Sequence, residues 1–166
     1  MKTIRFKIVI VAIFGLLVSA IQGNETAEAS LSNLPANRIT KEEAEIVKLT
    51  NRKRKKRGLK LLKINSQLVC LARKQSASMA RNNQLSHTVN GKTLAHRIDK
   101  SRYPYRYIGE NVARSKRSPP HVIKMWMKSQ GHRVNILNPN YREIGIGIIQ
   151  AKNGDKYFTQ IYGAPR

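Results

Sequence analysis

One acidic side chain of this sequence is a candidate for chemistry. After residue 45 the chain has only four acids: Asp99, Glu110, Glu143 and Asp155. Glu110 lies between a glycine and an asparagine, in an apolar and basic neighbourhood. A carboxylate in such surroundings pairs with cations or histidines, and His87 and His132 are the candidate partners. We therefore predict that the fold brings His87, Glu110 and His132 into one cleft.

Two imidazoles and a carboxylate are able to support more than one kind of chemistry. They can hold a Zn²⁺ ion with water in the open position, which makes His87, His132 and Glu110 tentative metal ligands. Without a metal, a histidine can act as a base while the glutamate orients it. A buried polar network that only fixes the cleft loops is the third interpretation.

Ser129 is a further candidate for the cleft. It precedes His132 by three residues, so the two side chains share a helix face if the helical winding continues between them. A serine beside a histidine suggests a nucleophile and its base. Two such side chains on one helix rarely aim at each other, however, and the sequence has no evident oxyanion hole. We therefore expect Ser129 to line the cleft and assign no catalytic residue.

The composition describes a single, very basic domain. A chain of 166 residues can bury one sizeable core, and its 32 lysines and arginines against nine acids give a net charge of +23. Such a charge attracts anionic cell-surface polymers, lipid headgroups or nucleic acid. An unusually basic proteome explains the charge equally well. Cys70 is the only cysteine, so no internal disulfide is possible, and we expect it to fill apolar space on a helix.

The first 23 residues have the pattern of a secretory signal. Three basic residues precede an uncharged apolar run, residues 8–20, which ends in a small-residue cleavage motif. The run is shorter than the roughly 20 residues of a membrane span, although an uncleaved anchor stays an alternative. We expect residues 24–39 to be a linker and 40–166 the domain. The protein is then a secreted or envelope-associated monomer, for which no specific nucleic acid is expected.

Helices account for most of the chain before residue 140. A capping box of Thr40 and Glu43 begins the first, and Gly58 follows its basic end. The cations of residues 52–57 are interpreted as a solvated helix end, with an anion-binding patch as the alternative. Further helices are predicted at residues 66–83, at residues 94–100, and from Ser118 to a break or bend at Gly131.

Extended segments complete the predicted fold. Apart from its short helix, the stretch 90–107 is loop-like, with its tyrosines in a half-buried extended segment. Two alternating strands follow residue 142, and Asn153-Gly154 between them predicts a hairpin. Gly145 and Gly147 leave one strand face bare for the close approach of a helix or a ligand. Helices followed by a hairpin indicate a layered α+β domain.

Seven motifs between residues 43 and 163 together carry a family resemblance. They are the segments 51–59, 68–72, 85–88, 109–113, 126–137, 144–147 and 157–160. In this order they resemble the CAP superfamily, that is, the SCP-like extracellular domain of the bacterial type. The resemblance implies export and a three-layer α-β-α sandwich with a small, mainly antiparallel sheet and a C-terminal β-hairpin. It also implies a cleft lined by two histidines and two acids.

The resemblance assigns these cleft positions one by one. His87 matches the first histidine, and Glu110 matches the acid of the Gly-Glu-Asn motif. His132 lies in the Gly-His-Arg-x-Asn-Ile-Leu pattern of bacterial relatives, whereas animal members follow their Gly-His with Tyr-Thr-Gln. Ser129 stands where animal members have the second acid, so the four-residue site is incomplete in this sequence.

Three functions follow from these observations. The first is an exported, non-catalytic domain whose cleft binds a divalent metal ion or a small ligand. The second is a metal-assisted hydrolase of peptide or cell-wall material. The third is a basic surface protein that binds polyanions through its net charge and residues 52–57. We favour the first, because the missing second acid weakens a hydrolytic site and a fold does not dictate a reaction.

Overall fold

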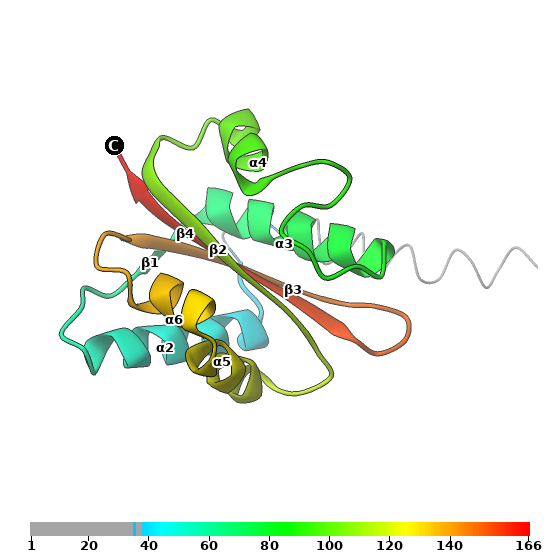
Figure 1. Cartoon of the computed structure of the whole chain (residues 1–166), viewed down its shortest axis with the longest axis horizontal. Helices are drawn as coiled ribbons and strands as arrows, with labels where there is room; N and C mark the ends of the chain where they lie inside the picture. Colours follow the sequence, from blue (N-terminus) through cyan, green and yellow to red (C-terminus); the bar gives the residue numbers. More distant parts are fainter. Residues whose placement is uncertain (1–34, 36–37) are drawn as a thin grey trace, which may run out of the picture.

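The computed structural model describes residue 35 and residues 38–166, so the predicted signal segment and most of the predicted linker lie outside the described residues. A four-stranded sheet lies between two helical layers (Figure 1). Helices α3 (Ser66–Arg81) and α4 (Leu94–Ser101) lie on one side. Helices α2 (Lys41–Lys55), α5 (Pro119–Lys128) and α6 (Gln130–Leu137) lie on the other. The predicted α+β class and three-layer sandwich are confirmed.

The sheet is mainly antiparallel, as expected. Its strands are β1 (Lys63–Ile64), β2 (Tyr105–Ser115), β3 (Glu143–Gln150) and β4 (Lys156–Pro165), in the order β1-β3-β4-β2. β3 and β4 form the predicted C-terminal hairpin, and β2 adds to β4 antiparallel. Only β1 pairs parallel, with β3. The short strand β1 was not among the predicted strands, since two residues are too few to show alternation.

The helix ends follow their capping chemistry. Thr40 accepts from the Glu43 amide at 3.2 Å while the Glu43 carboxylate accepts from the Thr40 amide at 2.8 Å, so the predicted capping box is present. Helix α3 ends two residues before the predicted residue 83. There Asn83 takes a left-handed conformation with φ of 47°, which asparagine tolerates and a helix does not.

The bare face of β3 receives a helix. A Cβ on Gly145 would lie 2.1 Å from the backbone carbon of Leu68, and one on Gly147 would lie 2.3 Å from the Arg73 amide nitrogen. The Ser76 hydroxyl donates to the Gly147 carbonyl at 2.9 Å, which fixes the two elements together. Of the two alternatives for this face, helix α3 is the one that occupies it.

The basic end of α2 is only partly solvated, which corrects our interpretation of residues 52–57. Arg54 is fully buried and donates to four backbone carbonyls: those of Lys60, Ile136, Asn138 and Tyr141. Burial lowers the pKa of its guanidinium. The neighbouring cations Arg52, Lys55, Lys56 and Arg57 are exposed, as expected. A helix with cations on every side turns one of them inward, and here that one joins α2 to α6.

Strand β2 was missed in the sequence, where residues 90–107 were predicted as mainly loop-like. Residues 110–113 are all buried, because α3 covers one face of the sheet and α5 and α6 cover the other. A strand buried on both faces lacks the alternation of apolar and polar residues that identifies a half-buried strand. The tyrosines before and at the start of β2 agree with a half-buried extended segment, since Tyr103 is buried and Tyr107 is exposed.

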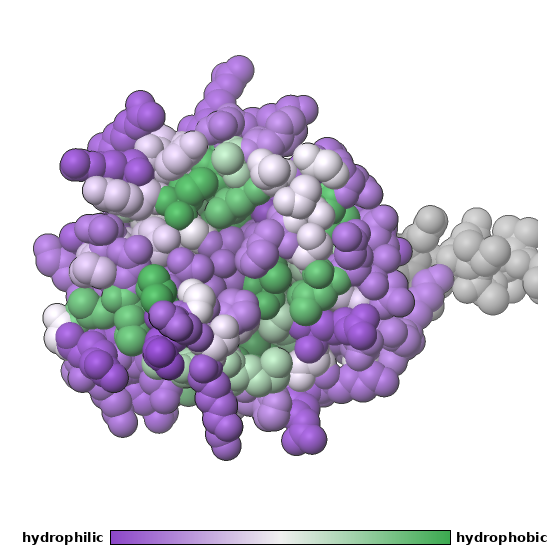
Figure 2. Space-filling view, in the orientation of Figure 1, coloured by the Kyte–Doolittle hydropathy of each residue, from purple (hydrophilic) through white to green (hydrophobic). Residues whose placement is uncertain are grey.

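The described surface is hydrophilic on the face drawn in Figure 2, with scattered apolar patches. Among the residues the structure describes, no helix has the length and apolar composition needed to cross a bilayer. Cys70 lies on α3, half-buried, as predicted for a small side chain on a helix.

Candidate functional site

Glu110 lies on β2, one of the two edge strands of the sheet. The carbonyls that β2 turns away from β4 accept hydrogen bonds from three side chains of the neighbouring helical layer and its following loop. The pairs are Ile108 with the Tyr141 hydroxyl, Glu110 with the Asn135 amide, and Val112 with the Trp126 indole, at 3.0, 3.0 and 3.2 Å. These caps protect the edge from pairing with another chain and hold Glu110 in place.

The Glu110 carboxylate is buried, and each of its oxygens has a partner. Nδ1 of His87 lies 2.9 Å from one oxygen, and Nη2 of Arg97 donates to the other at 2.9 Å. The same Arg97 nitrogen donates to the His87 carbonyl at 3.1 Å. The Glu110 side chain is 2% exposed and that of Arg97 9%, whereas that of His87 is 57% exposed. We call these three residues the His87–Glu110 site.

Arg97 is the member of this site that sequence reasoning missed. It lies on the predicted short helix, now α4, and nothing in its spacing distinguishes it from the other lysines and arginines. The expectation that Glu110 pairs with a cation or a histidine was the only available signal. It required a partner without saying which.

His132 approaches the site from the other side of the sheet edge. Successive residues of a strand point to opposite faces, so Glu110 turns toward α4 while Asn111 turns toward α6. The Asn111 amide donates to the His132 carbonyl at 3.1 Å, and the His132 ring packs near Trp126 at 6.4 Å between centroids. Among the described residues, the His132 ring has no hydrogen bond to Glu110. His132 is therefore a neighbour of the His87–Glu110 pair rather than part of it.

Ser129 does not share a helical face with His132, which corrects that expectation. The chain breaks at Ser129, whose extended φ and ψ of −83° and 126° separate α5 from α6. Gly131, the predicted break, lies inside α6. Ser129 is therefore a half-buried cap position, and its side chain makes no capping hydrogen bond.

A zinc ion does not fit the arrangement of these side chains as they stand. Nowhere in residues 38–166 do three histidine, cysteine, aspartate or glutamate side chains gather as metal ligands. Both oxygens of Glu110 are engaged, and the Arg97 guanidinium beside them repels a divalent cation. The zinc site with His87, His132 and Glu110 as ligands therefore has no preformed group here and stays a prediction.

The two histidines should titrate on opposite sides of their ordinary pKa of 6.5. The hydrogen bond that His87 donates to Glu110 raises the pKa of His87 against the opposing effects of burial and Arg97. Burial, and then the charge of His87, lower the pKa of His132. NMR titration of the ring protons should give two separate transitions, and Glu110→Gln should lower the pKa of His87.

The pH dependence of stability follows from the same pair. Because folding raises the pKa of His87, its contribution is complete below the unfolded value and is lost as pH rises through the folded value. The contribution is small, since the ring is more than half exposed. Identical His87 titrations in wild type and Glu110→Gln would contradict the pairing in solution.

Comparison with known proteins finds a family that matches most of the predicted domain. The family profile described as "CAP: Cysteine-rich secretory protein family" matches residues 47–162. The uncharacterized protein YkwD of Bacillus subtilis (strain 168) is 37% identical over 130 residues, which cover 76% of this chain and 50% of that protein. The chain thus spans half the length of this relative.

Solved structures give the same result for the fold. An extracellular protein containing an SCP domain from Bacillus anthracis str. Ames has a TM-score of 0.69 at 29% identity, over 74% of this chain and 40% of that one. An outer surface protein of Borrelia burgdorferi has a TM-score of 0.71 at 24% identity, over 78% of this chain and 97% of that one. At 24% identity, the likeness to the Borrelia protein concerns the fold alone.

Proposed function

The chain belongs to the CAP, or cysteine-rich secretory protein, family, and from this premise we propose that it is an exported domain that binds a small ligand at the His87–Glu110 site without catalysing a reaction. Export is supported by the signal pattern of residues 1–23 and by the similar Bacillus anthracis protein, which is described as extracellular.

The observation that carries the proposal is the state of the Glu110 carboxylate. It is buried and fully engaged by His87 and Arg97, so it serves to hold these two groups in position. Because a carboxylate only accepts, Nδ1 of His87 carries the proton toward it. The other ring nitrogen, Nε2, is then the polar atom of a half-exposed ring that a ligand can bond.

Chemistry beyond binding lacks support in the neighbouring groups. A general base needs a nucleophile or a positioned water, and Ser129 is a cap position that does not share a helix face with His132. The second acid of a metal-assisted hydrolase is replaced by that same serine. These features favour binding through a fixed imidazole over turnover.

The test uses muramyl dipeptide, a soluble cell-wall fragment with carboxylate and amide groups that a protonated imidazole can bind. Calorimetry of the full chain should show binding that weakens about tenfold in His87→Ala, which is the loss of one charge-assisted hydrogen bond. The titration is repeated with zinc chloride and with a chelator, and the recovered fragment is analysed by mass spectrometry. We expect an intact fragment and no requirement for zinc.

Two results would overturn this function. Equal affinity in wild type and His87→Ala would remove the ligand from the site. Cleavage of the fragment that needs zinc and is lost in Glu110→Gln would show the metal-assisted hydrolase instead. Ser129→Ala serves as the control, because we assign Ser129 no role in binding.

A further inference from the structure

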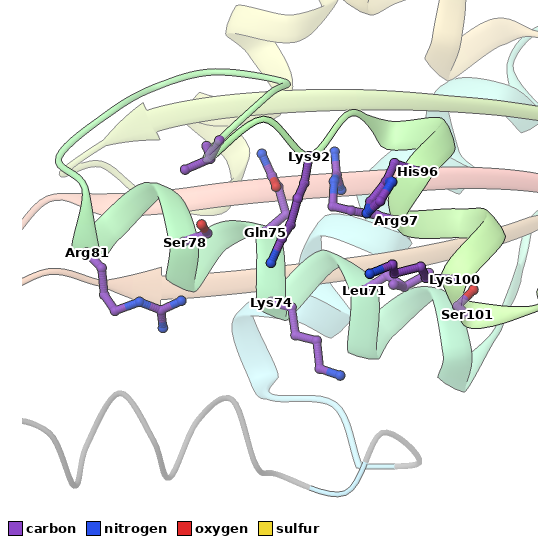
Figure 3. A pocket seen from close by; sticks show the side chains of 11 residues that line it. Leu71, Lys74, Gln75, Ser78, Arg81, Lys92, His96, Arg97, Lys100 and Ser101 are labelled. Carbon is purple, nitrogen blue, oxygen red and sulfur yellow. The ribbon is translucent and has the colours of Figure 1, made fainter.

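A second feature of the molecule lies between α3, α4 and the loop that joins them. It is a groove of about 420 Å³. Eleven residues line it, and Figure 3 draws their side chains. Five of them are lysines or arginines, and none is acidic: Lys74, Arg81, Lys92, Arg97 and Lys100. A groove with this lining carries a concentrated positive potential.

Arg97, which lines the groove, has two donors without a partner among the described residues. Arg97 uses only Nη2 for Glu110 and for the His87 carbonyl. Its Nε and Nη1 are buried and have no hydrogen-bond partner among the described residues. Buried guanidinium N–H groups without partners are costly, and a ligand with several acceptor oxygens would satisfy them.

We propose that this groove is a binding site for a phosphate group, held by the free edge of Arg97 and by Lys92 and Lys100. Lys92, just before α4, and Lys100, on α4, both line the groove, and Figure 3 draws their side chains. A guanidinium edge matches two phosphate oxygens, and lysines add point charges around them.

The size and charge of the groove select the ligand class. Its volume lies in the range of small-molecule sites, so it admits a phosphate with a small organic group. The excess of cations suits a doubly charged phosphate better than a single carboxylate. A free phosphate ester and a lipid headgroup share this chemistry, and the experiment below separates them.

This site goes beyond the proposed function and does not depend on it. Arg97 is the one residue that both sites share, whereas Lys92 and Lys100 line only the groove. A phosphate on Arg97 would offset the charge that opposes protonation of His87. Binding there should consequently raise the pKa of His87 further.

The test compares two double variants of equal net charge in the full chain. Lys92→Glu/Lys100→Glu reverses charge at the groove, and Lys48→Glu/Lys116→Glu does so at exposed positions, on α2 and after β2. Glycerol 3-phosphate is titrated by calorimetry at constant ionic strength, and vesicles of phosphatidylcholine with phosphatidic acid are sedimented with each protein. We expect the groove variant to bind about tenfold more weakly or worse, and the control to bind like wild type.

The outcomes are distinct. Selective loss with glycerol 3-phosphate supports the site for a free ester, and selective loss with vesicles alone supports it for a lipid headgroup. Equal loss in both variants would mean that net charge alone attracts anions, and no binding of either probe would remove the site. NMR titration of His87 with glycerol 3-phosphate reports on Arg97 separately, and an unchanged pKa would exclude Arg97 as a ligand.

Discussion

Replacing Glu110 with alanine should lower the free energy of unfolding by about 3–5 kcal/mol, the cost of breaking a buried ion pair by removing one partner. Arg97 would keep its charge in a place where its side chain is 9% exposed and two of its nitrogens already lack partners. Urea denaturation of wild type and variant measures the difference.

The matched controls use the other members of the site. His87→Ala should cost less than about 1 kcal/mol, because the ring is more than half exposed and its pair resembles a surface ion pair. The double variant Glu110→Ala/Arg97→Ala should be less destabilised than the sum of the single variants, since no unpaired charge remains. A loss below about 1 kcal/mol in Glu110→Ala would contradict a buried pair with Arg97.

Replacing Arg54 with alanine is the second change with a large expected effect, again about 3–5 kcal/mol, from the cavity and the orphaned acceptors together. The side chain is fully buried and donates to carbonyls of Ile136 and Asn138 at 2.9 and 2.8 Å. These carbonyls lie at the C-terminal end of α6, where the helix dipole favours a cation. Urea denaturation again gives the magnitude.

Arg54 also connects stability to the candidate site. Helix α6 carries His132 and the Asn135 amide that caps the Glu110 carbonyl, so loosening its end should shift the His132 ring signals in NMR spectra. Arg57→Ala is the control, because Arg57 is exposed in the same basic run and should change stability by no more than about 0.5 kcal/mol. Equal effects of the two variants would show that Arg54 is solvated after all.

Local signals were sufficient for most elements. The capping box at Thr40, the hairpin at Gly154 and the bare strand face at Gly145 and Gly147 each depend on residues that are neighbours in sequence. Predicting these features therefore needs only the local sequence. The motifs of the bacterial CAP type added the layer arrangement, which periodicity alone left as a general α+β domain.

The wrong predictions concern residues whose surroundings are set by residues distant in the sequence. Strand β2 has no alternation because both of its faces are covered, and Arg54 is buried because carbonyls from α6 and the following loop converge on it. The break at Ser129 places α6 against the edge of β2. Each of these contacts joins residues that are separated in the sequence by more than one helical turn or one hairpin.

The sequence by itself determined that Glu110 needs a cationic or histidine partner, because an isolated acid in apolar and basic surroundings must be neutralised. It also determined His87 as a candidate for that role. Only the tertiary structure decided that Arg97 takes the second oxygen and that His132 stays on the other side of the strand edge. The physical reason is that any of the many cations of the chain can neutralise a carboxylate at short range. The packing of the chain decides which cation lies close enough to do so.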